Sequence, residues 1–441
     1  MRLNKISINN QGSEKKRRII FFLQFASAIL CLAIAALSVM LIYVNLQNQD
    51  IKNGNLQVDA SQNSLIIQTN RSSGESSGLA EQESKYLPIS EVTENFFGPL
   101  PVPESPEEVQ NFQVRGLYIG MAGARSSGNF RDNISLVENS EMNSIIVNLK
   151  DESGVNFNSK NQKAYELQLV LSTYDLKETI ETAHEKGIKV IGRIVCFKDP
   201  PYARKNPDQC IQDLEGNVLQ FRGEKDNTFV NPYNTDYWEY LFSIAEEAVE
   251  LGIDEIQLDY VRFPTGKTVS DAQPFFGESG STPNKIDVIN YFLQTARIRI
   301  QEEYGIPVTA DVFGIILSDT SRYEEEILGQ EWRSIGLTGI SAVCPMAYPS
   351  HYREGSTING KTFEDPNANP YDVMYETLMV GKRYADEEDY AVVRPYLQAF
   401  DGYGYSEIND QIRAVYDAGY QEWILWESEV QYPSGSYDGK P

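Results

Sequence analysis

The sequence has only two histidines, His184 and His351, among 441 residues, and it is poor in basic residues. Zinc hydrolases normally draw several ligands from histidine, so we expect no such centre and assign no metal site. Lys and Arg number 38 against 63 Asp and Glu, which gives a formal net charge of -25. Nucleic-acid binding requires a basic surface, so we expect no nucleic-acid partner.

Two signatures of common enzyme classes are also missing from the predicted strand ends. None of the predicted strands runs into a Gly-x-Ser-x-Gly nucleophile elbow, which disfavours a Ser-His-Asp hydrolase. His184 lies in helical sequence and is interpreted as a surface residue, so only His351 follows a predicted strand. No glycine-rich phosphate loop follows the first predicted strand, and we expect no organic cofactor.

The N-terminus has the pattern of a membrane anchor. Residues 1–18 form a basic tail with six Lys and Arg, and residues 19–44 follow with no charged side chain. A membrane-spanning helix needs about 20 apolar residues, and flanking cations keep their side in the cytoplasm. The pattern predicts a single-pass signal anchor in the cell membrane, with the rest of the chain extracytoplasmic. A removed signal peptide and a buried core helix are the alternatives.

Residues 45–113 have the composition of a linker. Ser, Asn, Gln and Gly dominate its first part, and prolines crowd its end. Such a segment buries too little apolar surface to offset its ordering entropy, so we expect an extended or disordered tether. A short C-terminal tail, residues 433–441, follows the folded region. In an oxidising compartment Cys196 and Cys210 could form a disulfide, and the spacing leaves this open.

Residues 114–432 alternate between two sequence patterns. Segments with apolar residues at helical spacing, several of them ended by glycine, separate eight short apolar runs rich in β-branched residues. The eight runs are Val114–Ile119, Ser144–Leu149, Lys189–Val195, Glu255–Val261, Pro307–Val312, Ile340–Cys344, Val392–Leu397 and Trp423–Trp426. The alternation predicts a (β/α)8 TIM barrel that forms a monomeric head. A doubly wound open sheet is the alternative.

Polar residues gather where these runs end, which is where a TIM barrel carries its active site. Side chains alternate along a strand, so Asn148 and Lys150 are expected to share a face, as are Gln257 and Asp259. A buried hydrogen-bonded network that closes the core would explain any one of these residues, but the whole set favours a binding site. The candidates for substrate binding are Lys150, Asp151, Arg193, Gln257, Arg262, Tyr348, His351, Gln398, Trp426 and Glu427.

Carboxylates are the abundant reactive groups at these ends. Two carboxyl groups beside a cleft with aromatic platforms are typical of glycoside hydrolysis. Asp259 and Asp311 end two adjacent predicted strands, and Asp401 competes with Asp311 for the role of acid. We therefore expect a carbohydrate substrate, and adjacent strands favour a short carboxyl separation and retention of configuration.

Several stretches together resemble the bacterial putative glycoside hydrolase family, a family of TIM-barrel domains related to established glycosidases. They are Val114–Tyr118, Asn148–Gly154, Gly192–Pro200, Asp254–Pro264, Ala310–Gly314, Cys344–Tyr352 and Arg394–Asp401. The resemblance covers residues 114–432. Strand 8 departs from the family pattern, because Trp426 is followed by Glu427-Ser428-Glu429 where the family has Asn and then a small residue.

The resemblance implies a TIM barrel with hydrolytic activity. Related barrel glycosidases place their nucleophile on strand 4, and by similarity Asp259 is the nucleophile or a charge-stabilising carboxylate. A purely structural salt bridge of Asp259 with Arg262 or Arg193 is the alternative. Asp311 is then the general acid/base, with Arg193, Lys150 and Arg262 offsetting the negative charge. A catalytically silent carbohydrate-binding or cell-wall-binding barrel remains the alternative, since fold does not fix function.

Overall fold

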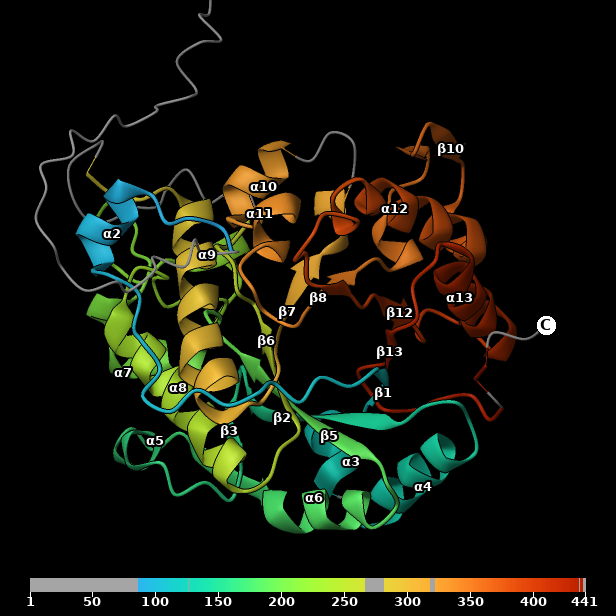
Figure 1. The fold of residues 1–441 in the computed structure, drawn as a ribbon, viewed down its shortest axis with the longest axis horizontal. Coiled ribbons are helices and arrows are strands. Elements are labelled where there is room, and N and C mark those ends of the chain that lie inside the picture. The colour runs from blue at the N-terminus through green and yellow to red at the C-terminus, as the bar shows by residue number, and fades with distance from the viewer. Residues whose placement is uncertain (1–85, 126, 266–280, 318–321, 436, 439–441) are drawn as a thin grey trace, which may run out of the picture. The chain divides into compact units, whose positions relative to one another are not determined.

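A computed structural model describes residues 86–125, 127–265, 281–317, 322–435 and 437–438 (Figure 1). The predicted basic tail, the predicted anchor at 19–44 and the tether up to residue 85 lie outside the described residues. Within the described ranges, no helix combines the length and the apolar character that a membrane span requires.

Eight parallel strands form a closed barrel at the centre of the described part of the chain, with helices around it (Figure 1). Each strand pairs with the next along the chain, and the register of Gly116 with Ile424 and with Ser144 closes the ring through the first strand. The barrel strands are β1 (Arg115–Tyr118), β2 (Ser144–Asp151), β5 (Lys189–Val195), β6 (Glu255–Asp259), β7 (Val308–Phe313), β8 (Ala342–Met346), β12 (Tyr396–Gln398) and β13 (Trp423–Trp426), with β11 (Val392–Val393) also paired to β8. The prediction of a (β/α)8 barrel is confirmed.

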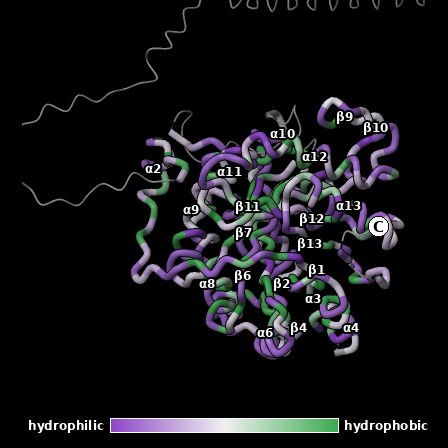
Figure 2. The backbone as a smooth tube through the Cα atoms, turned by 45° about the vertical axis from the view of Figure 1, so that its right-hand side comes forward, coloured by the Kyte–Doolittle hydropathy of each residue, from purple (hydrophilic) through white to green (hydrophobic). Residues whose placement is uncertain are grey.

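The surrounding helices bury one apolar face each against the strands. In α8 (Thr235–Glu250), the side chains of Tyr237, Leu241 and Ile244 are buried, and Asn234 caps the helix start by accepting from the Tyr237 amide. Figure 2 shows hydrophobic segments along the central strands and mostly hydrophilic residues along a peripheral helix such as α6. The other helices are α3 (Gly120–Arg125), α4 (Ser127–Glu138), α6 (Leu176–His184), α7 (Pro200–Lys205), α9 (Lys285–Ala296), α10 (Arg322–Leu328), α11 (Trp332–Gly336), α12 (Pro370–Ala385) and α13 (Tyr405–Asp417).

Two excursions extend the connections after barrel strands. After β2 the chain turns back as β3 (Gly154–Phe157), antiparallel to β2, and continues through α5 (Gln162–Glu166) to β4 (Val170–Tyr174). After β8 it forms a hairpin of β9 (Ser356–Ile358) and β10 (Lys361–Phe363). The sequence analysis predicted none of these additional strands.

The end of the predicted tether is ordered in part. Helix α2 (Glu91–Phe97) lies within it, and the Phe97 ring is 5.0 Å from the rings of both Trp238 and Tyr291, on α8 and α9. This differs from the extended tether expected for residues 45–113. The average composition of the linker hides the pair Phe96-Phe97, which supplies the apolar surface that anchors this turn of helix.

Candidate active site

A cavity of about 590 Å³ opens at the C-terminal ends of the barrel strands. It is lined by groups from strands or strand-end loops after β5, β6, β7, β8, β12 and β13. The lining residues are Arg193, Asp259, Tyr260, Arg262, Asp311, Phe313, Met346, Tyr348, His351, Tyr396, Phe400, Asp401, Trp426, Glu427, Ser428 and Glu429. The fold therefore gathers most of the predicted site residues in the cavity where the barrel rule places an active site.

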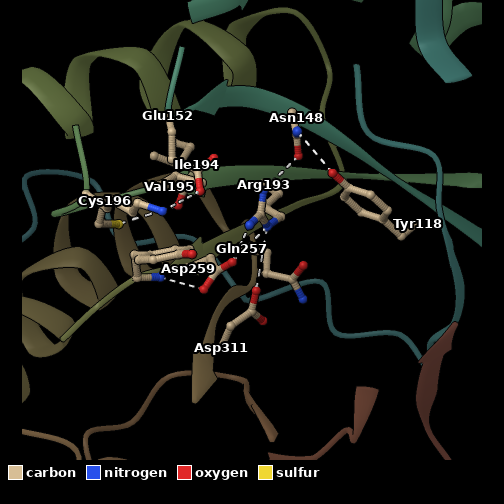
Figure 3. A network of polar contacts seen from close by, with 12 residues as sticks. Tyr118, Asn148, Glu152, Arg193, Ile194, Val195, Cys196, Gln257, Asp259 and Asp311 are labelled. Atoms are coloured by element: carbon tan, nitrogen blue, oxygen red, sulfur yellow. Dashed lines mark hydrogen bonds and ion pairs between the residues drawn. The ribbon is translucent and has the colours of Figure 1, made fainter. Parts of the chain in front are cut away.

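Asp259 and Arg193 form a buried ion pair on neighbouring strands (Figure 3). Asp259 is the last residue of β6, and its Oδ2 accepts from Nε of Arg193 at 3.0 Å and also from Nη2. As whole residues, Arg193 is 8% exposed and Asp259 is 4% exposed. Burial opposes the charge of Arg193, but Asp259 together with Tyr118, Tyr396 and Asp311 outweighs it and raises the pKa of Arg193 well above its usual value.

The same guanidinium extends this network to the first barrel strand (Figure 3). Nη1 of Arg193 donates to Oδ1 of Asn148 at 3.0 Å, and Nδ2 of Asn148 donates to the hydroxyl of Tyr118 at 3.1 Å. Arg193 is thereby held from two sides, and Asp259 with it. A carboxylate fixed in this way can be presented to a ligand in one orientation.

Asp311 lies on β7, next to this pair, and is 1% exposed. Its Oδ2 is 4.0 Å from Nε of Arg193, and its Oδ1 has no hydrogen-bond partner among the described residues. Burial, followed by the charge of Asp259, raises the pKa of Asp311 well above its ordinary value, against the opposing effect of Arg193. The arrangement favours a protonated Asp311 beside an ion-paired Asp259.

The hydroxyl of Tyr396 is a further group beside Asp311. It lies 2.6 Å from Oε1 of Gln257 and 3.4 Å from Oδ2 of Asp311. The longer contact to Asp311 favours the ionised carboxylate, so it offsets part of the rise in pKa that burial and Asp259 cause.

The two carboxyl groups are close to one another. Nε of Arg193 lies 3.0 Å from Oδ2 of Asp259 and 4.0 Å from Oδ2 of Asp311. The two oxygens are therefore at most about 7 Å apart, which includes the ~5–5.5 Å of retaining glycosidases and only the lower end of the ~6.5–9.5 Å of inverting ones.

Aromatic rings form the wall of the cavity on the side of β8 and β13. The ring of Trp426 is 5.8 Å from that of Tyr348 and 5.4 Å from that of Phe400. His351 packs edge-on against Tyr348, with ring centroids 4.9 Å apart, and burial lowers its pKa although Asp401 opposes this. Partly exposed rings of this kind are suitable platforms for sugar faces.

Two residues that line the cavity have strained backbone. Tyr260 follows Asp259 with φ of 52°, and Asp401 lies beyond β12 with φ of 54°. Non-glycine residues adopt this left-handed region at a cost, and such residues concentrate at functional sites. Glu427 also lines the cavity, and its Oε2 accepts from the Gln431 amide at 2.9 Å.

Lys150 and Asp151 do not line the cavity. Nζ of Lys150 pairs with Oδ2 of Asp199 at 2.9 Å, where both side chains are fully buried, and Asp151 accepts from the Ser153 amide. The register between β2 and β5 shifts between Asn148 and Lys150, so one extra residue on β2 turns Lys150 away from Asn148. The expectation that these two side chains share a face is therefore wrong.

Two predicted glutamines lie beneath or beside the cavity. Gln257 is fully buried, accepts from Tyr396 and donates to Sγ of Cys344 at 3.6 Å. Gln398 accepts from the Ser350 amide at 3.0 Å and donates to Asn367 at 3.0 Å, so it holds two strand-end loops together. Neither is among the residues that line the cavity.

Several lining residues were not among the sequence candidates. Tyr260, Phe313, Tyr396 and Phe400 line the cavity, and Tyr396 contacts Asp311. Tyr396 has the same parity as Gln398 on its strand, so the alternation rule could have found it. Its aromatic ring made it look like ordinary core.

Neither metal ligation nor a disulfide is evident in the described ranges. No three His, Cys, Asp or Glu side chains of these residues come together closely enough to hold a metal ion. Cys196 and Cys210 are free buried thiols, so the disulfide left open by their spacing is not present. Burial raises the pKa of Cys210 to about 12, which keeps this thiol unreactive.

Comparison with known proteins links the barrel to a family. The model of a family described as "putative glycosyl hydrolase domain" matches residues 116–432. A hypothetical protein from Ruminiclostridium thermocellum, known from its crystal structure, is 34% identical over 44% of this chain and 97% of its own, with a TM-score of 0.40. No curated protein matches the chain.

Two further solved structures are similar at low sequence identity. An α-L-fucosidase isoenzyme 2 from Paenibacillus thiaminolyticus is 17% identical over 73% of this chain and 47% of its own, with a TM-score of 0.47. An endo-1,4-β-D-mannanase from Thermotoga petrophila is 13% identical over 74% of this chain and 94% of its own, with a TM-score of 0.45.

Proposed function

Because the chain belongs to the putative glycosyl hydrolase domain family, we propose that it is a glycoside hydrolase that cleaves a polysaccharide or cell-envelope glycan in the strand-end cavity. The observation that carries this proposal is the pairing of a buried carboxyl group of raised pKa, Asp311, with an ion-paired carboxylate, Asp259. Glycosidases need one carboxyl group in each of these states.

Asp311 is the general acid in this proposal. Its raised pKa favours the protonated form, which can pass its proton to the glycosidic oxygen as the bond to the leaving group breaks. Asp401 also lines the cavity. It has no comparable burial, so it is the weaker candidate for this role.

Asp259 is the nucleophile. One of its oxygens forms a bond to the anomeric carbon while the leaving group departs, and Arg193 holds the carboxylate in place. Water then attacks the glycosyl-enzyme, Asp311 takes its proton, and the Asp259–sugar bond breaks. We propose retention of configuration because the two carboxyl oxygens are at most about 7 Å apart.

The test is sugar release from polysaccharides and purified bacterial cell envelopes by the full-length protein in detergent. Release that is lost in both Asp259→Asn and Asp311→Asn would support the proposal. Asp254→Asn is a matched control, because Asp254 pairs with Lys189 and His184 outside the cavity. No release from any substrate, combined with equal glycan binding by all variants, would instead favour a catalytically silent carbohydrate-binding barrel.

The reaction product tests the stereochemistry separately. Proton NMR during hydrolysis should detect first the anomer that has the configuration of the substrate. Appearance of the opposite anomer first would contradict retention, while leaving hydrolysis itself established. Asp259 would then be a base that activates water rather than a nucleophile.

The position of the enzyme at the membrane is part of the proposal. The uncharged stretch 19–44 after a basic tail supports a single-pass anchor with the barrel outside the cytoplasm. Protease added to intact cells should digest the barrel and leave a short membrane fragment. Recovery of the intact protein in the soluble cell fraction would contradict the anchor.

A further inference from the structure

Arg262 is a buried cation in the wall of the cavity. It lies in the loop after β6, three residues beyond Asp259, and is 9% exposed. Burying a charge is costly unless the group is paired, so the partner of such a residue identifies its role.

Among the described residues, Arg262 has no carboxylate partner. Its Nη1 donates to the carbonyl oxygen of Phe263 at 3.2 Å, and no carboxylate oxygen of the described chain lies within ion-pair distance. The other buried arginines each have a carboxylate: Arg193 has Asp259, Arg394 has Glu255, and Arg297 has Glu302. Arg262 differs from them in this respect, and like Arg193 it lines the cavity.

Three aromatic rings, those of Phe229, Tyr260 and Phe313, lie around the guanidinium of Arg262, which also hydrogen-bonds to the Tyr260 side chain. The centre of its guanidinium is 4.4 Å from the Phe313 ring centroid and 4.6 Å from that of Tyr260. Stacking of this kind fixes the plane of the guanidinium while its N–H groups still point outward within that plane. Such a preorganised fork matches the two oxygens of a carboxylate.

We infer that Arg262 binds the carboxylate of an acidic sugar, so that the substrate class is a glycan with uronic-acid-type residues. The inference rests on the proposed function, because it takes the cavity to be a sugar site. It adds a recognition element that hydrolysis alone does not require.

The charge of the other lining groups sets the orientation of that sugar. Asp401, Glu427 and Glu429 line the cavity at the ends of β12 and β13, whereas Arg262 lies at the end of β6. A sugar carboxylate is repelled by the first group and attracted by Arg262. The net charge of -25 also disfavours anionic glycans at long range, so a local cation is needed to bind one.

The experiment measures binding to acidic oligosaccharides and to their methyl esters, which lack the negative charge and carry one extra methyl group. Oligosaccharides of glucuronate, galacturonate and mannuronate are titrated calorimetrically into the full-length protein in detergent, on the Asp311→Asn background so that no hydrolysis intervenes. We expect at least one acid to bind about 10-fold or more tightly than its ester, because a charge-assisted fork is gained.

Variants assign the preference to this arginine. Arg262→Met should abolish the preference of acid over ester, and Arg262→Lys should retain part of it, because the charge remains without the fork. Lys198→Met is the matched control, since Lys198 lies over the same Tyr260 ring but does not line the cavity, and it should leave the preference intact. Thermal unfolding of each variant checks that the barrel is folded.

The outcomes separate this inference from the proposed function. Equal affinity for acid and ester, a preference that survives Arg262→Met, or no binding at all would overturn the inference. Hydrolysis of neutral glycans without any preference for acids would leave the proposed function standing alone. If the protein prefers acidic sugars but releases no sugar from any substrate, the inference would be supported and the proposed hydrolase function would be contradicted.

Discussion

The two ends of the barrel both bury charge, but they treat it differently. At the N-terminal end, Arg394 donates to Glu255 at 2.6 Å and to Glu422 at 2.8 Å, and Thr309 also donates to Glu255. At the C-terminal end, Asp311 has an unpaired oxygen and Arg262 lacks a carboxylate among the described residues. One strand, β6, carries Glu255 at its first position and Asp259 at its last.

The presence of a cavity does not by itself distinguish the two ends of the barrel. A smaller cavity of about 300 Å³ lies beside Glu255, Arg394 and Glu422, so both ends have a depression lined by charge. What differs is whether the buried groups satisfy one another. A satisfied cluster closes the core, whereas groups left without partners are costly unless a ligand completes them. Removing charges at either end should therefore have opposite consequences for stability and for activity.

The largest expected effect is at the C-terminal end, in Asp311→Asn. Loss of the general acid should lower the rate of glycan hydrolysis by about 10²–10⁴-fold. The fold should be as stable as before or more so, because burial already disfavours the charged form of this carboxyl group. Turnover and thermal unfolding of the same preparation measure both. If the variant unfolded at a markedly lower temperature, Asp311 would have a structural role like that of Glu255 and Glu422 at the N-terminal end.

At the N-terminal end we expect the reverse from Arg394→Met. Glu255 and Glu422 would then be buried without their partner, which typically destabilises a fold by about 3–5 kcal/mol. Urea denaturation measures this loss, and the hydrolysis rate per folded molecule should not change. Adding Glu255→Gln should restore part of the stability, since it removes one of the uncompensated charges. A loss of turnover at full stability would break the distinction between the two ends.

The strand pattern allowed the barrel and the central acid pair to be predicted. Apolar β-branched runs marked all eight strands, and the barrel rule brought Asp259 and Asp311 together because both lie toward the C-terminal ends of their strands. The predicted orientation of Lys150 was wrong because the alternation of side chains was extended across a bulge in β2. The bulge inserts one residue, so Lys150 points to the other face of the sheet. No single-sequence signal marks such a bulge, since its position depends on pairing with β5.

The hydrogen-bond partners of the side chains on β12 also could not be predicted from the sequence. Gln398 was predicted in the site because it ends a strand, yet it bonds to Ser350 and Asn367 in neighbouring loops. The aromatic Tyr396 was missed because a ring in a strand is typical of core packing. Its value lies in its hydroxyl, whose partners Gln257 and Asp311 become adjacent only when the barrel closes.

A smaller effect is expected from Tyr396→Phe, which sharpens the comparison by changing one hydroxyl at the C-terminal end. Oε1 of Gln257 would lose its hydrogen bond in a fully buried position, which should cost about 1–3 kcal/mol of folding free energy. The alkaline limb of the pH–rate profile should also move, since the hydroxyl favours ionisation of Asp311. Without it the pKa of Asp311 should rise, so activity should persist to higher pH. If the alkaline limb of the pH–rate profile did not change, the Tyr396 hydroxyl would have no influence on the pKa of Asp311.

The smallest effect concerns stability as a function of pH. The raised pKa of Asp311 means that above about pH 4, the ordinary pKa of an aspartate, the unfolded chain releases this proton while the folded chain keeps it. The contribution of Asp311 to stability should therefore fall as pH rises, until the folded pKa is reached. Asp311→Asn removes this penalty, so its stability advantage over the native protein should grow from acid to neutral pH in urea denaturation.

Asp213→Asn provides a control of opposite sign for this measurement. Hydrogen bonds from the backbone of Asn217, and others nearby, lower the pKa of the exposed Asp213, so its carboxylate stabilises the fold above the unfolded pKa and this contribution is lost toward acid. The Asp213→Asn variant should thus be less stable than the native protein at neutral pH and equal to it in acid. If both variants showed the same trend, the pH dependence would reflect net charge rather than the burial of Asp311, and the contrast between the unsatisfied C-terminal end and the rest of the molecule would fail.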